Sequence, residues 1–324
     1  MAITTKEELE KITDLSEDER SWFELSQGKG MPFRLPDIFA GYLSCDAIRR
    51  QFIPSVEELN ESPLTLDPQR EDKYSPRPRL VHRYVNRVAF KVSDRCFGYC
   101  RYCFRRRMIE KEMLITSEEI DDICEYLRRD YESEDVPIEE ILITGGDPLT
   151  LSNEMLEEIF TKVREANPDI IIRLCTRALS TCPERFDDEL IALLERMNEE
   201  TPLFLMTQFN SSIEVMTESF LKADILNKHG IAMFNQSVLL KGVNDDAEKL
   251  KALSRMLLTM FIKPYYIFLC DDVKGTEHFF VSKERALEIE NDLRRIASGL
   301  EMPVFMKDLP NGGGKVPLWM LFQK

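Results

Sequence analysis

The chain has 324 residues, of which 43% are hydrophobic, and it carries a formal net charge of −15. This length accommodates one large α/β domain of roughly 200–250 residues with a smaller appendage. The acidic balance argues against nucleic-acid binding, which needs a basic surface. No apolar run reaches the roughly 18 residues of a membrane span, and the N-terminus lacks a signal-peptide layout. We therefore expect a soluble, cytoplasmic protein with neither nucleic-acid nor membrane partners.

The first 80 residues are polar and irregular, with short helical pieces, and predict an N-terminal helical extension. Residues 60–80 contain four prolines, which favour an extended connector. We expect the main barrel domain over residues 81–300. Residues 301–324 are then a short C-terminal segment.

From residue 88 onward, strand and helix patterns alternate. The helices place apolar residues at i, i+3, i+4 and i+7, and the first begins with the capping box Thr116-Ser117-Glu118-Glu119. Six βα units predict a parallel sheet with right-handed crossovers, and six rather than eight predict a partial TIM-like (β/α)6 barrel of the α/β class. The expected strands, with a last short one, are Val88–Ser93, Glu140–Thr144, Ile170–Cys175, Leu203–Thr207, Ala232–Leu239, Tyr265–Leu269 and Pro303–Met306.

Three cysteines follow the first strand with the spacing C-x3-C-x2-C: Cys96, Cys100 and Cys103. A structural zinc site uses four protein ligands, and an ordinary four-iron cluster uses four thiolates. Three thiolates leave one iron of a [4Fe-4S] cluster open. The spacing resembles the signature of radical S-adenosylmethionine (SAM) enzymes, in which SAM binds that iron. The alternative is a zinc site completed by Cys270 or His82. Most of the other five cysteines are expected to be small buried apolar residues.

Unusual residues fall at the C-terminal ends of the predicted strands, where barrel enzymes assemble their sites. Polar residues are common in loops, and a pair of glycines also fits a tight turn. Neither alternative explains why cysteines and a glycine-flanked lysine stand at equivalent ends. The residues are Cys96, Gly145-Gly146-Asp147, Thr176-Arg177, Gln208, Asn235-Gln236-Ser237, Asp271-Asp272, Asp308 and Gly312-Gly313-Gly314-Lys315.

Lys315 and the run Arg105–Arg107 are charged, and each has two interpretations. Lys315 fits a solvated tail, but the glycines before it allow close approach, which suits Schiff-base chemistry. Arg105–Arg107 fits a solvated surface run. It also fits an anion clamp, because the planar fork of arginine binds both oxygens of a carboxylate.

The chain resembles the lysine 2,3-aminomutases, which are radical SAM enzymes that also use pyridoxal phosphate (PLP). The resemblance implies a radical SAM barrel with a short C-terminal PLP-binding segment. It also implies an isomerase that converts free L-lysine to β-lysine with the help of a reducing electron donor. The matching segments are Asp46–Glu58, His82–Arg87, the cysteine run, Gly145–Leu149, Asn235–Asp245, Pro264–Tyr266 and Asp308–Pro317.

The resemblance implies a role for each matching residue. The three cysteines hold the cluster, and Lys315 binds PLP covalently. Arg105 clamps the substrate carboxylate, while Asp271 and Asp308 receive its ε-ammonium. The glutamate-acting relatives do not keep both acids, which favours lysine. The other cofactor-binding candidates are Gly145, Gly146, Asp147, Arg177, Gln208 and Gln236 near SAM, and Arg83, Tyr84 and Arg87 around PLP.

The chain also departs from the longer members. Gln208 stands where they have a histidine near SAM, and Asp246 replaces one cysteine of their C-terminal zinc site. We therefore expect no zinc and a simpler homo-oligomer. The short ending, with Cys100–Arg106 and Val273–Ser282, resembles a sister group that isomerises one lysine of elongation factor P. That protein is the alternative substrate. Two further alternatives are a divergent radical SAM enzyme acting on another amino acid, and a structural metal protein.

Overall fold

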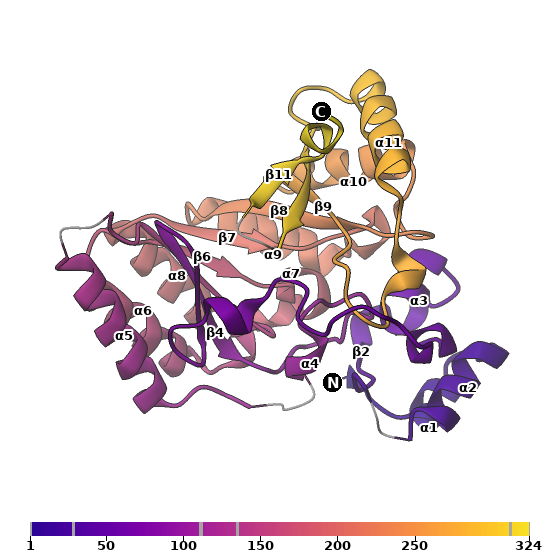
Figure 1. Ribbon diagram of the computed structural model, residues 1–324, viewed down its shortest axis with the longest axis horizontal. Coiled ribbons are helices and arrows are strands. Elements are labelled where there is room, and N and C mark those ends of the chain that lie inside the picture. The colour runs from indigo at the N-terminus through magenta and orange to yellow at the C-terminus, as the bar shows by residue number, and fades with distance from the viewer. Residues whose placement is uncertain (1, 28–29, 110–112, 134–135, 311–312, 324) are drawn as a thin grey trace.

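A computed structural model describes residues 2–27, 30–109, 113–133, 136–310 and 313–323 (Figure 1). Its centre is a nine-stranded sheet in the order β11-β10-β9-β8-β7-β6-β5-β4-β3. Strands β4 to β10 are parallel, and β3 and β11 pair antiparallel at the two ends. The strands are β3 (Leu80–Tyr84), β4 (Arg87–Ser93), β5 (Glu140–Gly145), β6 (Ile171–Cys175), β7 (Leu203–Thr207), β8 (Ala232–Leu239), β9 (Ile262–Leu269), β10 (Val304–Leu309) and β11 (Gly314–Pro317).

Each of the six parallel connections contains a helix, so the prediction of a partial βα barrel is confirmed. The capping box before α5 is present, because Thr116 Oγ1 accepts from the Glu119 amide and the Glu119 side chain accepts from the Thr116 amide. Gly230 follows α9 with φ +74°, a conformation that favours glycine after a helix end. The connecting helices are α4 (Arg106–Ile109) and α5 (Ser117–Tyr131), α6 (Asn153–Ala166), α7 (Ala178–Thr181) and α8 (Asp188–Glu200), α9 (Thr217–Lys228), α10 (Ala247–Thr259) and α11 (Lys283–Ile296).

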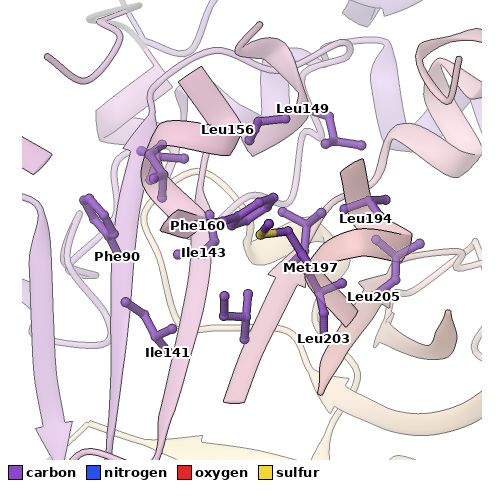
Figure 2. Packing of buried hydrophobic residues seen from close by; sticks show 14 of the residues in the cluster. Phe90, Ile141, Ile143, Leu149, Leu156, Phe160, Leu194, Met197, Leu203 and Leu205 are labelled. Atoms are coloured by element: carbon purple, nitrogen blue, oxygen red, sulfur yellow. The ribbon is translucent and has the colours of Figure 1, made fainter. Parts of the chain in front are cut away.

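Side chains alternate between two faces along each parallel strand. One face packs against the helices: Figure 2 shows Phe160 of α6 among side chains of the strands and of α8. Each large apolar side chain buried there contributes about 1.5–3 kcal/mol to stability. The opposite face lines the inside of the curved sheet and carries the polar residues Arg87, Thr144, Arg173 and Gln236. The alternation therefore separates the core from the site.

The sheet closes through side chains where β3 approaches β10 and β11. Arg83 of β3 donates to Asp308 of β10 at 2.6 Å and also to the Leu309 carbonyl. A Cβ on Gly314 of β11 would lie 3.1 Å from the ring of Tyr84. No backbone ladder joins β3 to β11 in the part of the chain that the structure describes. Neither edge strand was predicted from the sequence, because each is short and polar.

The N-terminal extension forms its own small core, which includes Trp22, Phe39 and Phe52. Its connector, residues 60–80, is more structured than expected: Glu71–Tyr74 form a 3-10 helix, and Thr65 makes a parallel bridge with Val273. None of the described helices is both long and apolar enough to cross a bilayer. The extension comprises β1 (Ala2–Ile3), α1 (Lys6–Glu10), α2 (Glu17–Leu25), β2 (Leu35–Pro36) and α3 (Asp46–Phe52).

Candidate active site

A cavity of about 370 Å³ runs from the inside of the sheet to the loops after the parallel strands. Every residue to which the resemblance assigns a role lines it, although these residues are widely separated in the chain. Only Gly312, in the glycine run, lies outside the described residues. The lining candidates are Arg83, Tyr84, Arg87, Cys96, Cys100, Cys103, Arg105, Gly145, Gly146, Asp147, Arg177, Gln208, Gln236, Asp271, Asp308 and Lys315.

The N-terminal extension holds the cysteine loop through buried ion pairs. Arg101 donates to both oxygens of Glu58 at 2.8 and 2.6 Å, and Arg106 donates to Glu58 at 2.6 Å. Burial acts to raise the pKa of Glu58, but the two guanidinium groups outweigh it and hold the pKa below its usual value. Breaking such a buried pair on one side costs about 3–5 kcal/mol. The loop that carries the three cysteines is therefore rigidly attached to the extension.

The donor set of the cysteine loop fits an iron–sulfur cluster. The three thiols are free of disulfides and line the same cavity. Burial raises the pKa of Cys103 to about 12, and a coordinated metal deprotonates such a thiol outright. Among the described residues, no group of three His, Cys, Asp or Glu side chains is arranged to hold a single metal ion. A cluster binds each thiolate to a different iron, so three thiols that line one cavity are the ligands that such a cluster needs.

The two fourth ligands considered for zinc are engaged elsewhere. His82 Nδ1 is hydrogen-bonded to Tyr126 at 2.6 Å, and Cys270 lies in an apolar cluster with Phe279. The expectation that most of the other cysteines are buried is wrong. Only Cys124 and Cys270 are buried, and Cys175 lines the cavity.

Gly145 and Gly146 allow the loop after β5 to pack on the backbone that leads into the cysteine loop. Gly145 has φ +128°, and a Cβ there would lie 2.4 Å from the Ser93 carbonyl oxygen. A Cβ on Gly146 would lie 2.3 Å from the Arg95 carbonyl oxygen. The Gly146 amide donates to Ser93 at 2.5 Å and the Asp147 amide to Arg95 at 2.6 Å. Both glycines are thus required by close backbone packing at the edge of the cavity.

Gly146→Ala is expected to destabilise the protein by about 1–3 kcal/mol, because the new methyl group meets fixed backbone atoms. Thermal unfolding measures this loss. Gly41→Ala is the matched control, since nothing lies within 4 Å of a Cβ there. Equal melting temperatures for the two variants would contradict the packing argument.

Asp147, Arg177 and Gln208 link the strand loops to the cysteine loop. Asp147 accepts from Thr176 Oγ1 at 2.7 Å and from the Arg177 amide at 2.8 Å. The Arg177 side chain donates to Cys100 Sγ at 2.7 Å and to Tyr102 Oη at 2.8 Å. Gln208 donates to the same Tyr102 oxygen at 3.0 Å. These residues therefore fix the surroundings of one cluster cysteine.

Lys315 lies on β11, where the two ends of the sheet approach each other, and its amine faces two aromatic rings. Its Nζ is 5.1 Å from the ring centre of Phe268 and 5.8 Å from that of Tyr266. Burial, with the positive charge of Arg173, lowers the pKa of Lys315 to about 8. A lysine that is partly uncharged near neutral pH is an effective nucleophile towards an aldehyde. The site thus fits the aldehyde of PLP.

Arg173 is a site residue that the sequence reasoning missed. It lies in the middle of β6, donates to Glu140 at 3.0 Å through Nη1, and has a buried Nη2 without a hydrogen-bond partner. A buried, unpaired cationic donor beside the cavity is suited to an anion such as phosphate. The available signal was a charge inside an otherwise apolar strand, Ile171-Ile172-Arg173-Leu174-Cys175.

The three residues expected to hold the substrate each have a partner within the protein. Arg105 donates to Glu71 at 2.7 Å, Asp308 accepts from Arg83 at 2.6 Å, and Asp271 accepts from Gln69. Burial raises the pKa of Asp271 to about 6, with Asp308 adding to the rise and Lys307 opposing it. The sequence reasoning missed both Gln69 and Glu71, because they lie in the connector.

Comparisons with known proteins agree with this geometry. The model of the radical SAM superfamily matches residues 90–253. The chain is 36% identical to the L-lysine 2,3-aminomutase of Bacillus subtilis, over 98% of this chain and 66% of that protein. It is 36% identical to the L-lysine 2,3-aminomutase of Fusobacterium nucleatum, over 96% and 73%. The glutamate 2,3-aminomutase of Clostridioides difficile is equally similar, at 36% over 98% and 74%.

Two solved structures share the fold. A radical SAM methyltransferase from Sphaerobacter thermophilus gives a TM-score of 0.52 at 17% identity, covering 71% of this chain and 68% of that one. SuiB of Streptococcus suis, bound to SAM, gives 0.50 at 12% identity, covering 69% and 50%. At these identities the likeness concerns the fold alone.

Proposed function

Because this chain belongs to the lysine 2,3-aminomutase family of the radical SAM superfamily, we propose that it moves the α-amino group of free L-lysine to C3, giving β-lysine. The relatives act on either lysine or glutamate by name, so the family alone leaves the substrate open. The observation that favours lysine is the pair Asp271 and Asp308 on one cavity with Arg105. Two acids recognise a terminal ammonium, and one arginine recognises the carboxylate.

The cluster and SAM fit the cysteine side of the cavity. When bound, they would supply the radical chemistry that starts the amino shift. The chain's part is to hold Cys96, Cys100 and Cys103 on a loop that Glu58 keeps rigid. Gly146 and Asp147 hold the neighbouring loop against it.

PLP fits the Lys315 side of the cavity. When bound, it supplies a conjugated system that stabilises an unpaired electron during the amino shift. Lys315 anchors the cofactor at its aldehyde, and Arg173 offers its free Nη2 to an anion. Arg83, Tyr84 and Arg87 lie on the same side, with the Arg87 guanidinium 3.8 Å from the Tyr84 ring centre. Arg83, one of the residues proposed to surround PLP, also pairs with Asp308, one of the two acids proposed to bind the substrate ammonium.

Product analysis tests the proposal. The protein is incubated without oxygen with L-lysine, SAM, PLP and a chemical reductant, and β-lysine is sought. Parallel reactions replace free lysine with L-glutamate or with elongation factor P. We expect β-lysine from free lysine alone. Turnover of glutamate only, or of the protein lysine only, would reject the proposed substrate.

Asp308→Asn is expected to raise the KM for lysine by roughly 10–100-fold, because the ammonium then donates to a neutral amide oxygen instead of pairing with a carboxylate. SAM cleavage without lysine should change little. Asp272→Asn is the matched control, since Asp272 bonds Lys307 and does not line the cavity. A loss of SAM cleavage as large as the loss of lysine affinity would argue against recognition of the ammonium by Asp308.

A further inference from the structure

The connector is held beside the cavity by Arg105 and Arg107, which follow Cys103 in the sequence. Arg107 pairs with Asp67 at 3.1 Å and with Asp72 at 2.5 Å, and Arg105 pairs with Glu71. The amide of Lys274 also donates to the Thr65 carbonyl at 3.0 Å. We call residues 65–74 the strap. It brings two side chains into the site, Gln69 and Glu71.

At the arginine end, Glu71 uses the donors that a substrate carboxylate needs. Glu71 Oε1 accepts from Arg105 Nε at 2.9 Å and from Nη2 at 2.7 Å. Arg105 Nη1 donates to Thr144 Oγ1 at 2.9 Å. Both Glu71 and Arg105 are largely buried in this pair. A substrate carboxylate can therefore form a bidentate pair with Nε and Nη2 of Arg105 only after Glu71 leaves.

At the acidic end, Gln69 occupies Asp271. Gln69 Nε2 donates to Asp271 Oδ1, and Gln69 Oε1 accepts from Arg83 Nη1 at 2.7 Å. The other terminal nitrogen of Arg83 donates to Asp308. The strap thus places a carboxylate on Arg105 and an amide nitrogen on Asp271. An amino acid with a terminal cation presents the same two kinds of group.

We propose that the strap is an internal competitor of the substrate, and that Glu71 and Gln69 determine which amino acids enter. This inference rests on the proposed function. When the substrate displaces Glu71 from Arg105, one carboxylate replaces another, so the binding free energy changes little. At Asp271, the substrate replaces a neutral amide donor with an ammonium, so the carboxylate gains an ion pair in place of a hydrogen bond in which only the acceptor is charged. The strap therefore admits amino acids whose side chain ends in a cation.

The test uses Glu71→Gln in the full chain loaded with cluster, SAM and PLP. Hydrogen exchange of the strap amides is measured with and without L-lysine, and lysine affinity by calorimetry. In the wild type, lysine is expected to speed exchange in the strap. In Glu71→Gln, exchange is expected to be fast without lysine, and the Kd for lysine about 3–10-fold lower. The bond to Arg105 then holds no carboxylate charge that the substrate must displace.

Asp72→Asn is the matched control, because Asp72 holds the same strap through a half-exposed pair outside the cavity. Such pairs contribute little, so lysine affinity should change less than twofold. Unchanged or weaker lysine binding in Glu71→Gln overturns the proposal, as does slower strap exchange when lysine binds to the wild type. If the wild type binds no lysine, the proposed substrate fails. In that case the exchange rate of Glu71→Gln without ligand still decides whether Glu71 fastens the strap.

Discussion

Lys315→Ala is expected to abolish the absorption band of protein-bound PLP and to lower aminomutase turnover by about 10³-fold or more, a loss typical of a removed covalent nucleophile. In the proposed function, the amine of Lys315 is the group that bonds covalently to the cofactor. Because burial lowers its pKa to about 8, the wild-type band should form faster as the pH rises through 8. Absorption spectra of anaerobically purified protein, with PLP added at several pH values, measure both effects.

Lys263→Ala provides the control for this substitution. Lys263 also lies on a strand of the sheet, but its Nζ donates to the Leu300 carbonyl near the surface. The Lys263→Ala variant should keep the absorption band of bound PLP and the aminomutase turnover of the wild type. A band that survives in Lys315→Ala would remove Lys315 from its proposed role. A rate of band formation that is flat between pH 7 and 9 would show that the lysine is fully charged or fully neutral throughout that range.

Replacement of Cys96, Cys100 or Cys103 by serine is expected to abolish SAM cleavage and to remove most of the iron. A four-iron cluster held by three thiolates has no spare protein ligand. Iron and sulfide analysis of the reconstituted wild type should give about four of each per chain. Electron paramagnetic resonance of the reduced protein reports the cluster directly.

Cys45→Ser serves as the matched variant. Cys45 precedes α3, makes no side-chain capping bond and lies outside the cavity, so its replacement should leave the iron content unchanged. Zinc near one per chain in the wild type, with little iron, would contradict the cluster. Full iron content in any of the three cluster variants would show that another residue replaces the missing thiolate.

The N-terminal extension has a larger part in the site than its sequence suggests. Its buried Glu58 binds two arginines of the cysteine loop, and its connector brings Gln69 and Glu71 into the cavity. The extension is polar and irregular, so periodicity gives no hint of these contacts. They depend on pairing of Glu58 and Glu71 with arginines at 101–106, and of Gln69 with Arg83 and Asp271, which are remote in sequence.

The parallel strands β4 to β9 were predictable because each is a short apolar run between amphipathic helices. Their polar ends could be assigned to one edge of the sheet, since parallel strands end on the same side. By contrast, β3 and β11 are short and carry Arg83, Tyr84 and Lys315. Their strand character arises from pairing with neighbours, and local sequence does not encode that pairing.

The sequence by itself determined which reactive groups this protein carries: three thiols at cluster spacing, a glycine-flanked lysine, and the two acids and one arginine that we propose bind the ends of an amino acid. Only the tertiary structure decided how those groups are engaged. It paired Arg105 with Glu71, Asp308 with Arg83 and Asp271 with Gln69. Buried charges require partners, and which partner each receives depends on chain segments that meet only in the folded barrel.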